Sequence, residues 1–480
     1  MIEKRALYIN GEWVDPDTPR DYPVIDPATE EQCAVISLGD QADTDAAVAA
    51  ARAAFPTWSA TPPEERIALL EKILETYEAS YTDQMAEAIR MEMGAPYDLA
   101  HGSQAPSLPG ALKDAIRSAK KIKWVEPLGD HAPNDRIIRQ PIGVVGMITP
   151  WNWPISQIAL KVFPALAAGC TMVLKPSEEA PLSGVLFAEI LDKAGVPAGV
   201  FNMVNGDGAG VGTQLSEHPD VDMISFTGST RAGKLISKAA AETLKRVRLE
   251  LGGKGANLIF ADADEKAVTR GVRHCMNNTG QSCNAPTRML VERSRYDEAV
   301  AEAAKAADQI KVGPTNEPGR HIGPLVNKTQ WDKVQGLIEV GIKEGARLVA
   351  GGPGLPEGVN RGYYVRPTVF ADVSNDMEIA QTEIFGPVLS IIPFEDEAEA
   401  IAIANDTPYG LTNYVQSSDD ARRVRLAHAL QSGMVEMNGN FRGGGSPFGG
   451  IKMSGDAREG GVWGIEEYLE VKSVSGWAAE

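Results

Sequence analysis

The feature that most constrains this chain is a regular alternation of strand-like and helix-like segments between residues 142 and 252. Short runs rich in aliphatic and β-branched residues, each bounded by Gly, Pro, Ser or Asn, recur about every 25 to 30 residues. The predicted strands are Ile142 to Thr149, Thr171 to Lys175, Phe201 to Asn205, Asp222 to Phe226 and Val247 to Leu251. The predicted helices between them are Ile155 to Ala168, Ala180 to Ala194, Ala209 to Glu217 and Thr230 to Ala241. Because strands that alternate with helices pair in parallel through right-handed crossovers, this region predicts a doubly wound α/β sheet.

The rest of the chain predicts a second α/β region and an arm. Residues 40–100 read as two or three helices, and helical spacing returns near 264–278, 295–310, 330–345 and 396–405. Between them, residues 119–141 carry the alternating run Arg136-Ile137-Ile138-Arg139 and read as a β arm, and the tail is again strand-like from Tyr468 to Val471. A length of 480 residues fits two or three domains.

Composition narrows the partners. A formal charge of −19 argues against nucleic acid, because phosphate binding needs clustered Lys and Arg. No apolar run approaches the roughly 18 residues of a membrane span, so we expect a cytoplasmic protein. The four cysteines are scattered without a CxxC pair, which predicts neither a disulfide framework nor a metal site.

Two glycine-rich turns follow predicted strands and open predicted helices, where backbone N–H groups can hold phosphate. The first, Gly206 to Gly212, lacks the G-x-G-x-x-G spacing, so an ordinary flexible turn explains it equally well. The second, Gly228 to Lys234, nearly matches a P-loop, but Leu235 stands where magnesium binding needs Ser or Thr. This mismatch argues against an ATPase and leaves a turn whose Ser229 hydroxyl and amides can bind a pyrophosphate.

Polar residues also follow the first two predicted strands. Lys175 and Glu178 lie where a nucleotide-binding sheet contacts ribose hydroxyls, although a solvated turn is the alternative. A charged Glu178 facing the ribose would repel a 2′-phosphate and favour NAD over NADP. The rigid turn Thr149 to Pro154 carries Asn152, whose side-chain amide can donate to an oxyanion; a stiff structural loop is the alternative.

Cys283 and Glu250 form the candidate catalytic pair. Cys283 lies in the polar run Asn277 to Asn284, and Glu250 lies 33 positions earlier (283 − 250). A thiol is a nucleophile only as its thiolate, and a nearby carboxylate can act as a base on a proton or a water. A lone cysteine is most often a small buried apolar residue, so the assignment depends on its context.

Eight ordered motifs supply that context. They are Tyr8-Ile9-Asn10-Gly11-Glu12-Trp13, Pro150-Trp151-Asn152-Trp153-Pro154, Lys175-Pro176-Ser177-Glu178, Phe226-Thr227-Gly228-Ser229, Glu250-Leu251-Gly252-Gly253-Lys254, Gly280-Gln281-Ser282-Cys283, Glu383-Ile384-Phe385-Gly386-Pro387 and Pro447-Phe448-Gly449-Gly450-Ile451-Lys452-Met453-Ser454-Gly455. On these motifs the chain resembles the aldehyde dehydrogenase superfamily nearly from end to end. The resemblance implies an NAD-binding domain (1–118 and 142–252), a catalytic domain (253–453), and an arm and tail (119–141 and 454–480) that join a homodimer or homotetramer.

The resemblance also implies NAD-dependent oxidation of an aldehyde to the carboxylic acid. Cys283 would attack the carbonyl, and the Asn152 amide with the Cys283 N–H would hold the oxyanion. After hydride transfer to the nicotinamide, water activated by Glu250 would hydrolyse the thioester. No metal is implied.

Two binding sites follow from the same resemblance. NAD, or NADP in its place, would contact Ile148, Trp151, Lys175, Glu178, Gly206, Gly210, Gly228, Ser229, Leu251, Glu383 and Phe385. The aldehyde would contact Trp153, Asn284, Phe441 and Phe448. Residues 281–288 are similar to a branch that acts on ω-oxo acids or semialdehydes.

Three alternatives have to be weighed against this reading. A CoA-acylating semialdehyde dehydrogenase would pass the thioester to CoA and would have no use for the base Glu250. A protein that keeps the fold without turnover would not need Cys283, Glu250 and Asn152 together. A cysteine hydrolase is disfavoured because no motif contains a histidine; the nearest, His274, lies nine positions (283 − 274) before the thiol.

Overall fold

The five strands predicted between residues 142 and 252 all form and lie in one sheet of the computed structural model, which describes residues 1–477. In spatial order the strands of this sheet are β12 (Arg246–Glu250), β11 (Met223–Thr227), β8 (Val144–Ile148), β9 (Thr171–Lys175), β10 (Phe201–Met203), β2 (Leu7–Ile9) and β3 (Glu12–Val14). The first five pair in parallel, as predicted. The last two form an antiparallel hairpin that the sequence pattern did not reveal.

The strand order of this sheet reverses at one place. From β8 the chain moves outward on one side through β9 and β10, and then returns to place β11 and β12 on the other side. Ligands of doubly wound sheets bind outside the carboxyl ends of the strands at such a switch point. The segments that follow β8 and β11 carry Asn152 and Ser229, so the topology brings these two predicted site residues to the expected crevice.

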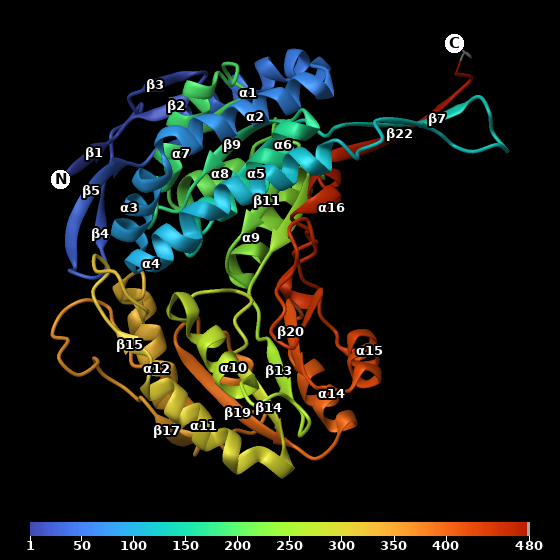
Figure 1. Cartoon of the computed structure of the whole chain (residues 1–480). Coiled ribbons are helices and arrows are strands. Elements are labelled where there is room, and N and C mark those ends of the chain that lie inside the picture. Colours follow the sequence, from blue (N-terminus) through green and yellow to red (C-terminus); the bar gives the residue numbers. More distant parts are fainter. Residues whose placement is uncertain (478–480) are drawn as a thin grey trace.

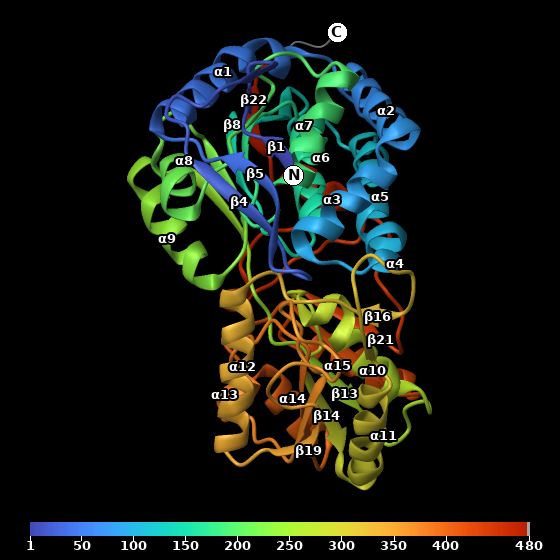
Figure 2. The ribbon, with the colours of Figure 1, turned by 90° about the vertical axis from the view of Figure 1, so that its left-hand side faces the viewer.

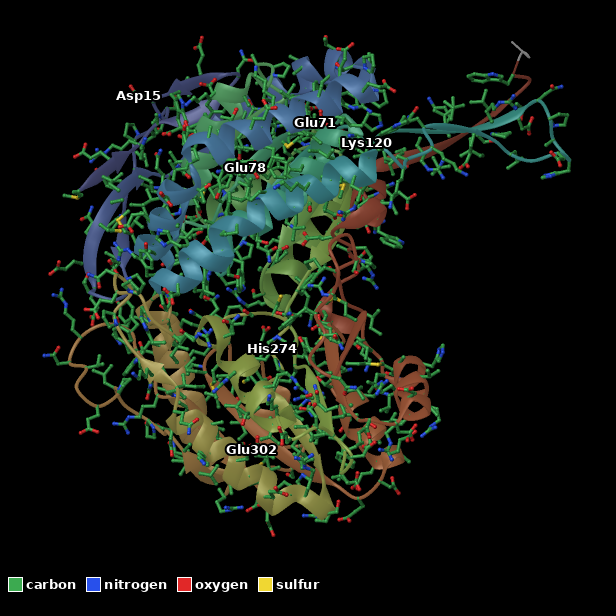
Figure 3. The ribbon with its side chains drawn as sticks, viewed as in Figure 1. Asp15, Glu71, Glu78, Lys120, His274 and Glu302 are labelled. Atoms are coloured by element: carbon green, nitrogen blue, oxygen red, sulfur yellow. The ribbon has the colours of Figure 1, made fainter. Side chains whose placement is uncertain are left out.

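Helices cover both faces of the first sheet (Figures 1 and 2). One face packs against α2 (Pro63–Ser80), α3 (Thr82–Met93), α5 (Ala105–Ala119), α6 (Pro154–Ala168) and α7 (Leu182–Ala194). The other face packs against α1 (Gln41–Ala60), α8 (Thr213–Glu217) and α9 (Thr230–Ala240). Helix α6 is apolar almost all round and 13 of its 15 residues are buried, as expected for a helix enclosed by its neighbours. Lys120, at the end of α5, reaches Glu71 of α2 at 3.1 Å on the surface (Figure 3).

A second seven-stranded sheet forms the other half of the molecule. Its strands, in spatial order, are β17 (Arg347–Ala350), β18 (Thr368–Ala371), β19 (Val388–Phe394), β14 (Arg288–Glu292), β13 (Ala256–Ile259), β20 (Thr412–Gln416) and β21 (Met434–Met437). One face packs on α10 (Ala267–Met276) and α11 (Tyr296–Asp308), and the other on α12 (Lys328–Lys343), α13 (Glu378–Gln381), α14 (Glu397–Asn405) and α15 (Asp420–Ala429). The sequence predicted α10, α11, α12 and α14 near their observed bounds but not α13 or α15.

The predicted arm forms and projects away from both halves (Figure 1). It is a three-stranded antiparallel sheet of β22 (Leu469–Ser475), β7 (Asp135–Pro141) and β6 (Val125–Pro127). Val125 and Val471 leave 49% and 67% of their surface exposed on it. Its role in joining subunits stays a prediction, as do the domain boundaries, and residues 478–480 of the predicted tail lie outside the described residues.

Short elements complete the structure. Strands β1 (Ile2–Lys4), β5 (Glu31–Ser37) and β4 (Asp21–Asp26) form a small sheet, and β15 (Lys311–Val312) pairs with β16 (His321–Ile322). A single turn α4 (Tyr97–Leu99) and a π-helical turn η1 (Ala100–Gln104) lead into α5, and α16 (Gly461–Glu466) packs on α5 and α6. Across residues 1–477, no helix has both the length and the apolar character that a bilayer crossing requires.

Candidate active site

A cavity of about 200 Å³ lies at the switch point of the first sheet and is lined on the opposite side by residues of the second half. Its lining is Pro150, Trp151, Asn152, Thr227, Gly228, Ser229, Leu251, Gly252, Cys283, Gln330, Lys333, Glu383 and Phe385. The first eight come from the ends of β8, β11 and β12 or from the segments that follow them, and the last five come from the second half. The cavity therefore unites three predicted strand ends with the predicted nucleophile.

The loop that presents Cys283 is held by unusual backbone conformations. Asn278 and Thr279 have left-handed φ values of 51° and 58°, and Gly280 follows at 73°. A Cβ on Gly280 would lie 2.0 Å from the carbonyl oxygen of Gly386, so only glycine fits there. Non-glycine residues in this region cost energy and persist where the surrounding structure demands the shape.

The Cys283 thiol is half-buried in the cavity wall. Burial raises its pKa well above the usual value, and the charges of Glu250 and Glu383 raise it further. The sulfur is therefore a thiol at neutral pH in the free protein. Cys33 is also half-buried, whereas Cys170 and Cys275 lie in the core.

Glu250 ends β12 beside the cavity and is only 1% exposed. Neither carboxyl oxygen has a hydrogen-bond partner among the described residues. Burial raises the pKa of this carboxyl well above its usual value. The negative charge of Glu459 raises this pKa further, whereas the positive charges of Lys161 and Arg458 lower it. A buried carboxyl without partners is costly, and such groups concentrate at functional sites.

A buried ion pair lies near Glu250. Lys161 of α6 donates to Glu459 at 2.5 Å, and their side chains are 1% and 7% exposed. Gly449 closes this region, because a Cβ there would lie 2.7 Å from a Glu250 carboxyl oxygen. The charges around Glu250 are therefore fixed by residues far apart in the chain.

Replacing the unpartnered carboxyl is expected to stabilise the protein. The raised pKa means that the folded state binds the Glu250 proton more tightly than the unfolded state, so the stability tied to this group is lost as pH rises through that pKa. Glu250→Gln should gain about 1–3 kcal/mol at pH 8 and less at pH 5. Thermal midpoints of both proteins across this range would measure it. A midpoint difference that does not grow with pH would contradict the assignment.

Asn152 is 3% exposed and held on both sides. Its Nδ2 donates to the carbonyl oxygen of Gln281 at 3.1 Å, which leaves one N–H uncommitted at the cavity. The backbone carbonyl oxygen of Asn152 accepts from Asn278 Nδ2 at 3.0 Å. The predicted oxyanion donor is thus tied directly to the loop of the predicted nucleophile.

The predicted ribose and phosphate residues form a second cluster at the ends of β9 and β10. Lys175 is 3% exposed, and its Nζ donates to the carbonyl oxygens of Pro176 (2.9 Å) and Gly206 (2.5 Å) and to Glu178 (3.1 Å). The N–H of Gly210 donates to Asp207 at 2.5 Å. This cluster lies beyond the lining of the cavity itself.

Trp151, Glu383 and Phe385, three of the residues predicted to contact NAD, line the cavity. Trp151 meets Phe385 edge to face across it, with ring centroids 5.4 Å apart. Glu383 accepts from the N–H of Gly253 at 2.9 Å, and burial raises the pKa of its carboxyl. A Cβ on Gly252 would lie 2.2 Å from a Glu383 oxygen, which explains glycine at that position.

Of the other predicted cofactor residues, Gly228, Ser229 and Leu251 also line the cavity, and Ser229 caps α9 by accepting from the N–H of Ala232 at 3.2 Å. Ile148 does not line it. Its side chain is 6% exposed and packs in the apolar core between β8 and the helices.

Two of the four predicted substrate residues, Trp153 and Asn284, contact or belong to the thiol loop, the segment Asn277 to Asn284 that presents Cys283. Trp153 donates its indole N–H to Ser282 at 2.9 Å, and the carbonyl of Asn284 accepts from Tyr414 at 2.6 Å. Phe448 pairs through its backbone with Glu459, both hydrogen bonds being 2.7 Å. The Arg442 guanidinium lies over the Phe448 ring at 4.6 Å.

Phe441 is placed elsewhere. It is 77% exposed and lines a separate cavity of about 530 Å³, together with His274 of α10 and Tyr414. Burial lowers the pKa of His274 to about 4, so its ring is neutral there. The structure does not bring Phe441 to the cavity of Cys283.

Sequence reasoning missed several residues of the site. Lys161 is the only charge in an apolar helix, a signal that was available. No local sequence signal marks Glu459, Gln330 or Lys333, or the buried Gln104 that contacts the Asn152 backbone. Each of these residues meets the site only through tertiary contacts.

Comparison with known proteins identifies the family of this chain. The sequence profile described as "Aldehyde dehydrogenase family" matches residues 13–474. A 3-succinoylsemialdehyde-pyridine dehydrogenase from Pseudomonas sp. is 52% identical over 479 residues, 99% of each chain. The crystal structure of an aldehyde dehydrogenase from Bartonella henselae superposes with a TM-score of 0.98 at 60% identity, covering 99% of this chain and 100% of that one.

A variant of aldehyde dehydrogenase C from Pseudomonas syringae, solved with NAD+ and octanal, has a TM-score of 0.97 at 47% identity and covers 99% and 97% of the two chains. The α/β fold and the family expected from the sequence are confirmed. The chain belongs to the aldehyde dehydrogenase family.

Proposed function

We propose that the enzyme oxidises an aldehyde to the carboxylic acid with NAD as acceptor, through a thiohemiacetal and a thioester on Cys283. One observation supports this most strongly. The half-buried thiol of Cys283 and the amide of Asn152 line the same cavity. Glu250, whose carboxyl has no hydrogen-bond partner among the described residues, is the last residue of β12, and the chain after β12 forms part of the cavity wall.

The first step is addition of sulfur to the aldehyde. Cys283 gives its proton to solvent water, its Sγ bonds to the carbonyl carbon, and the π electrons of the carbonyl move onto its oxygen, which becomes an alkoxide. The free N–H of Asn152 and the backbone N–H of Cys283 hold that oxygen. One such donor is worth about 2.7–4 kcal/mol of the barrier.

The second half of the reaction releases the acid. NAD, when bound, accepts the hydride that leaves the former aldehyde carbon. Glu250 then takes a proton from water, which attacks the thioester and frees the Cys283 sulfur. A base works best with a pKa near the working pH, so the raised pKa of Glu250 suits this role.

The chain offers a fitting set of groups for NAD. The switch-point crevice carries the Ser229 turn at the start of α9, the carboxyl of Glu383 and the paired rings of Trp151 and Phe385. Lys175 and Glu178, with Gly206 and Gly210 nearby, lie where the adenosine ribose and phosphates would extend. Ile148 would contribute through its backbone only, because its side chain is in the core.

Glu178 is expected to set the preference for NAD. Its side chain is 26% exposed beside Lys175, and a carboxylate there repels the extra phosphate of NADP. Glu178→Gln keeps the size and removes the charge, so the ratio of kcat/KM for NAD to that for NADP should fall by about 10-fold. An unchanged ratio would remove Glu178 from this role.

The substrate is an aldehyde with an apolar chain behind the reacting group. The Pseudomonas sp. relative is named for 3-succinoylsemialdehyde-pyridine and the Pseudomonas syringae variant was solved with octanal. Trp153 offers aromatic surface at the thiol loop, where Asn284 also lies. Phe448, which pairs through its backbone with Glu459, is proposed as a further apolar wall. Phe441 lines the separate cavity of about 530 Å³ and not the cavity of Cys283.

The deciding experiment incubates the enzyme with NAD and octanal, with and without CoA, and measures NADH and the product. The proposal expects one octanoate for each NADH in both reactions, because Glu250 directs the thioester to water. Octanoyl-CoA as the main product would establish the CoA-acylating alternative. The predicted domain boundaries and the homodimer or homotetramer belong to the same proposal.

A further inference from the structure

Gln104 has an unusual position for a buried amide. It is 1% exposed and ends the π-helical turn η1, which inserts extra backbone into the run from α4 to α5. Such turns are rare and occur frequently at functional sites. Its Nε2 lies 3.4 Å from the carbonyl oxygen of Asn152, 3.3 Å from Asn278 Oδ1 and 3.5 Å from Met93 Sδ.

These three neighbours fix which way the Gln104 amide points. All three are acceptors, so the NH₂ group must face them. The opposite orientation would place its oxygen against two other oxygens and a sulfur. Its Oε1 has no partner among the described residues, so the donors and not the acceptor hold this side chain.

Gln104 in turn orients Asn278. Because Asn278 Oδ1 accepts from Gln104, its Nδ2 faces the carbonyl oxygens of Asn152 (3.0 Å) and Gln281 (3.2 Å). The Gln281 carbonyl also accepts from Asn152 Nδ2 at 3.1 Å. A chain of buried amides therefore runs from η1 through the thiol loop to the side chain that faces the cavity.

We propose that Gln104 is a positioning residue for the oxidation, which acts by holding Asn278 and the backbone of Asn152 so that the free Asn152 N–H points at the oxyanion. The inference rests on the proposed function. Asn152 has one N–H bound to Gln281 and one left for the reaction, so a small rotation of its amide removes the useful bond. Misplacement of a reacting group by about 1 Å can cost about 100-fold in rate.

The test is a double-substitution cycle on the rate constant of the first NADH burst, with NAD and octanal. Asn152→Ala alone should slow the burst by at least about 100-fold. Gln104→Met keeps the size of the side chain and removes its donors, and should slow the burst by about 10-fold. In the Asn152→Ala background the same Gln104→Met change should have no further effect, because the group it positions is gone.

Gln335→Met is the matched control. Gln335 is a buried glutamine of α12 that accepts from the N–H of Gly354 at 2.7 Å and does not line the cavity. Gln335→Met should lower the thermal midpoint as Gln104→Met does, but it should leave the rate constant of the NADH burst unchanged. Gln104→Glu provides a second variant should Gln104→Met fail to fold, because it keeps the shape and a polar head but offers one donor at most. It should slow the burst and lose this effect in the Asn152→Ala background.

The outcomes distinguish the positioning role of Gln104 from the proposed function of the enzyme. An unchanged burst in the Gln104 variants, or an equal loss with and without Asn152, would overturn the positioning role and leave the proposed function standing. An unchanged burst in Asn152→Ala would overturn the oxyanion assignment of the proposed function, and the role of Gln104 with it.

Discussion

Cys283→Ala is expected to lower NADH formation by at least about 10⁴-fold while NAD still binds. The loss is large because the aldehyde carbon has no hydride to release until sulfur converts it to a tetrahedral alkoxide. The substitution leaves unchanged the part of the cavity wall that Trp151 and Glu383 form, where NAD is proposed to bind. Steady-state NADH formation and NAD titration by fluorescence quenching would measure the two effects separately.

Cys33→Ala is the matched control for this variant. Cys33 is the other half-buried cysteine of the chain and lies on β5, where its thiol donates to the carbonyl of Val24 at 3.4 Å. Its replacement should leave turnover unchanged. Appreciable turnover in Cys283→Ala, or an equal loss in Cys33→Ala, would refute the assignment of the nucleophile.

Glu250→Gln is expected to separate the two halves of the reaction. The charge of Glu250 raises the pKa of Cys283, so the neutral amide makes the thiolate easier to form and leaves acylation intact. Hydrolysis loses its base and should slow by about 10²- to 10⁴-fold. Rapid mixing should therefore show a burst of NADH of about one per active site, followed by a slow steady state.

Glu92→Gln is the control for loss of a buried carboxyl. Glu92 is fully buried on α3, where burial raises its pKa to about 7, and it accepts from the N–H groups of Leu182 and Ser183 at the start of α7. Its loss should lower stability without changing the shape of the NADH trace. If Glu250→Gln showed no burst while steady turnover continued, Glu250 would not be the hydrolytic base.

The sequence predicted the first sheet because its pattern is local. Buried parallel strands are short apolar runs ended by turn residues, and β9 matches its predicted bounds of 171–175. The hairpin of β2 and β3 was missed because three-residue strands carry too little pattern. Its attachment beside β10 depends on a partner 195 positions away (203 − 8), which no local window contains.

The site was predictable where chemistry and turn geometry share one motif. Asn152 lies in the turn after β8, Cys283 in the thiol loop and Glu383 in the segment between α13 and β19, and the fold brings all three to one cavity. The charges that surround Glu250 were not predictable, because Lys161 and Glu459 form an ion pair although they lie 298 positions apart in the sequence. Phe441 shows the opposite limit: its place in the chain is close to Phe448, but the loop between them turns it outward.

The covalent intermediate is the central claim, and its direct test is mass spectrometry of Glu250→Gln after mixing with NAD and octanal and quenching in acid. The account predicts a gain of one octanoyl group per chain, which fragmentation places on Cys283 and not on Cys275 of the neighbouring helix. Full NADH burst with no acyl group on the protein, or an acyl group on another residue, would contradict it.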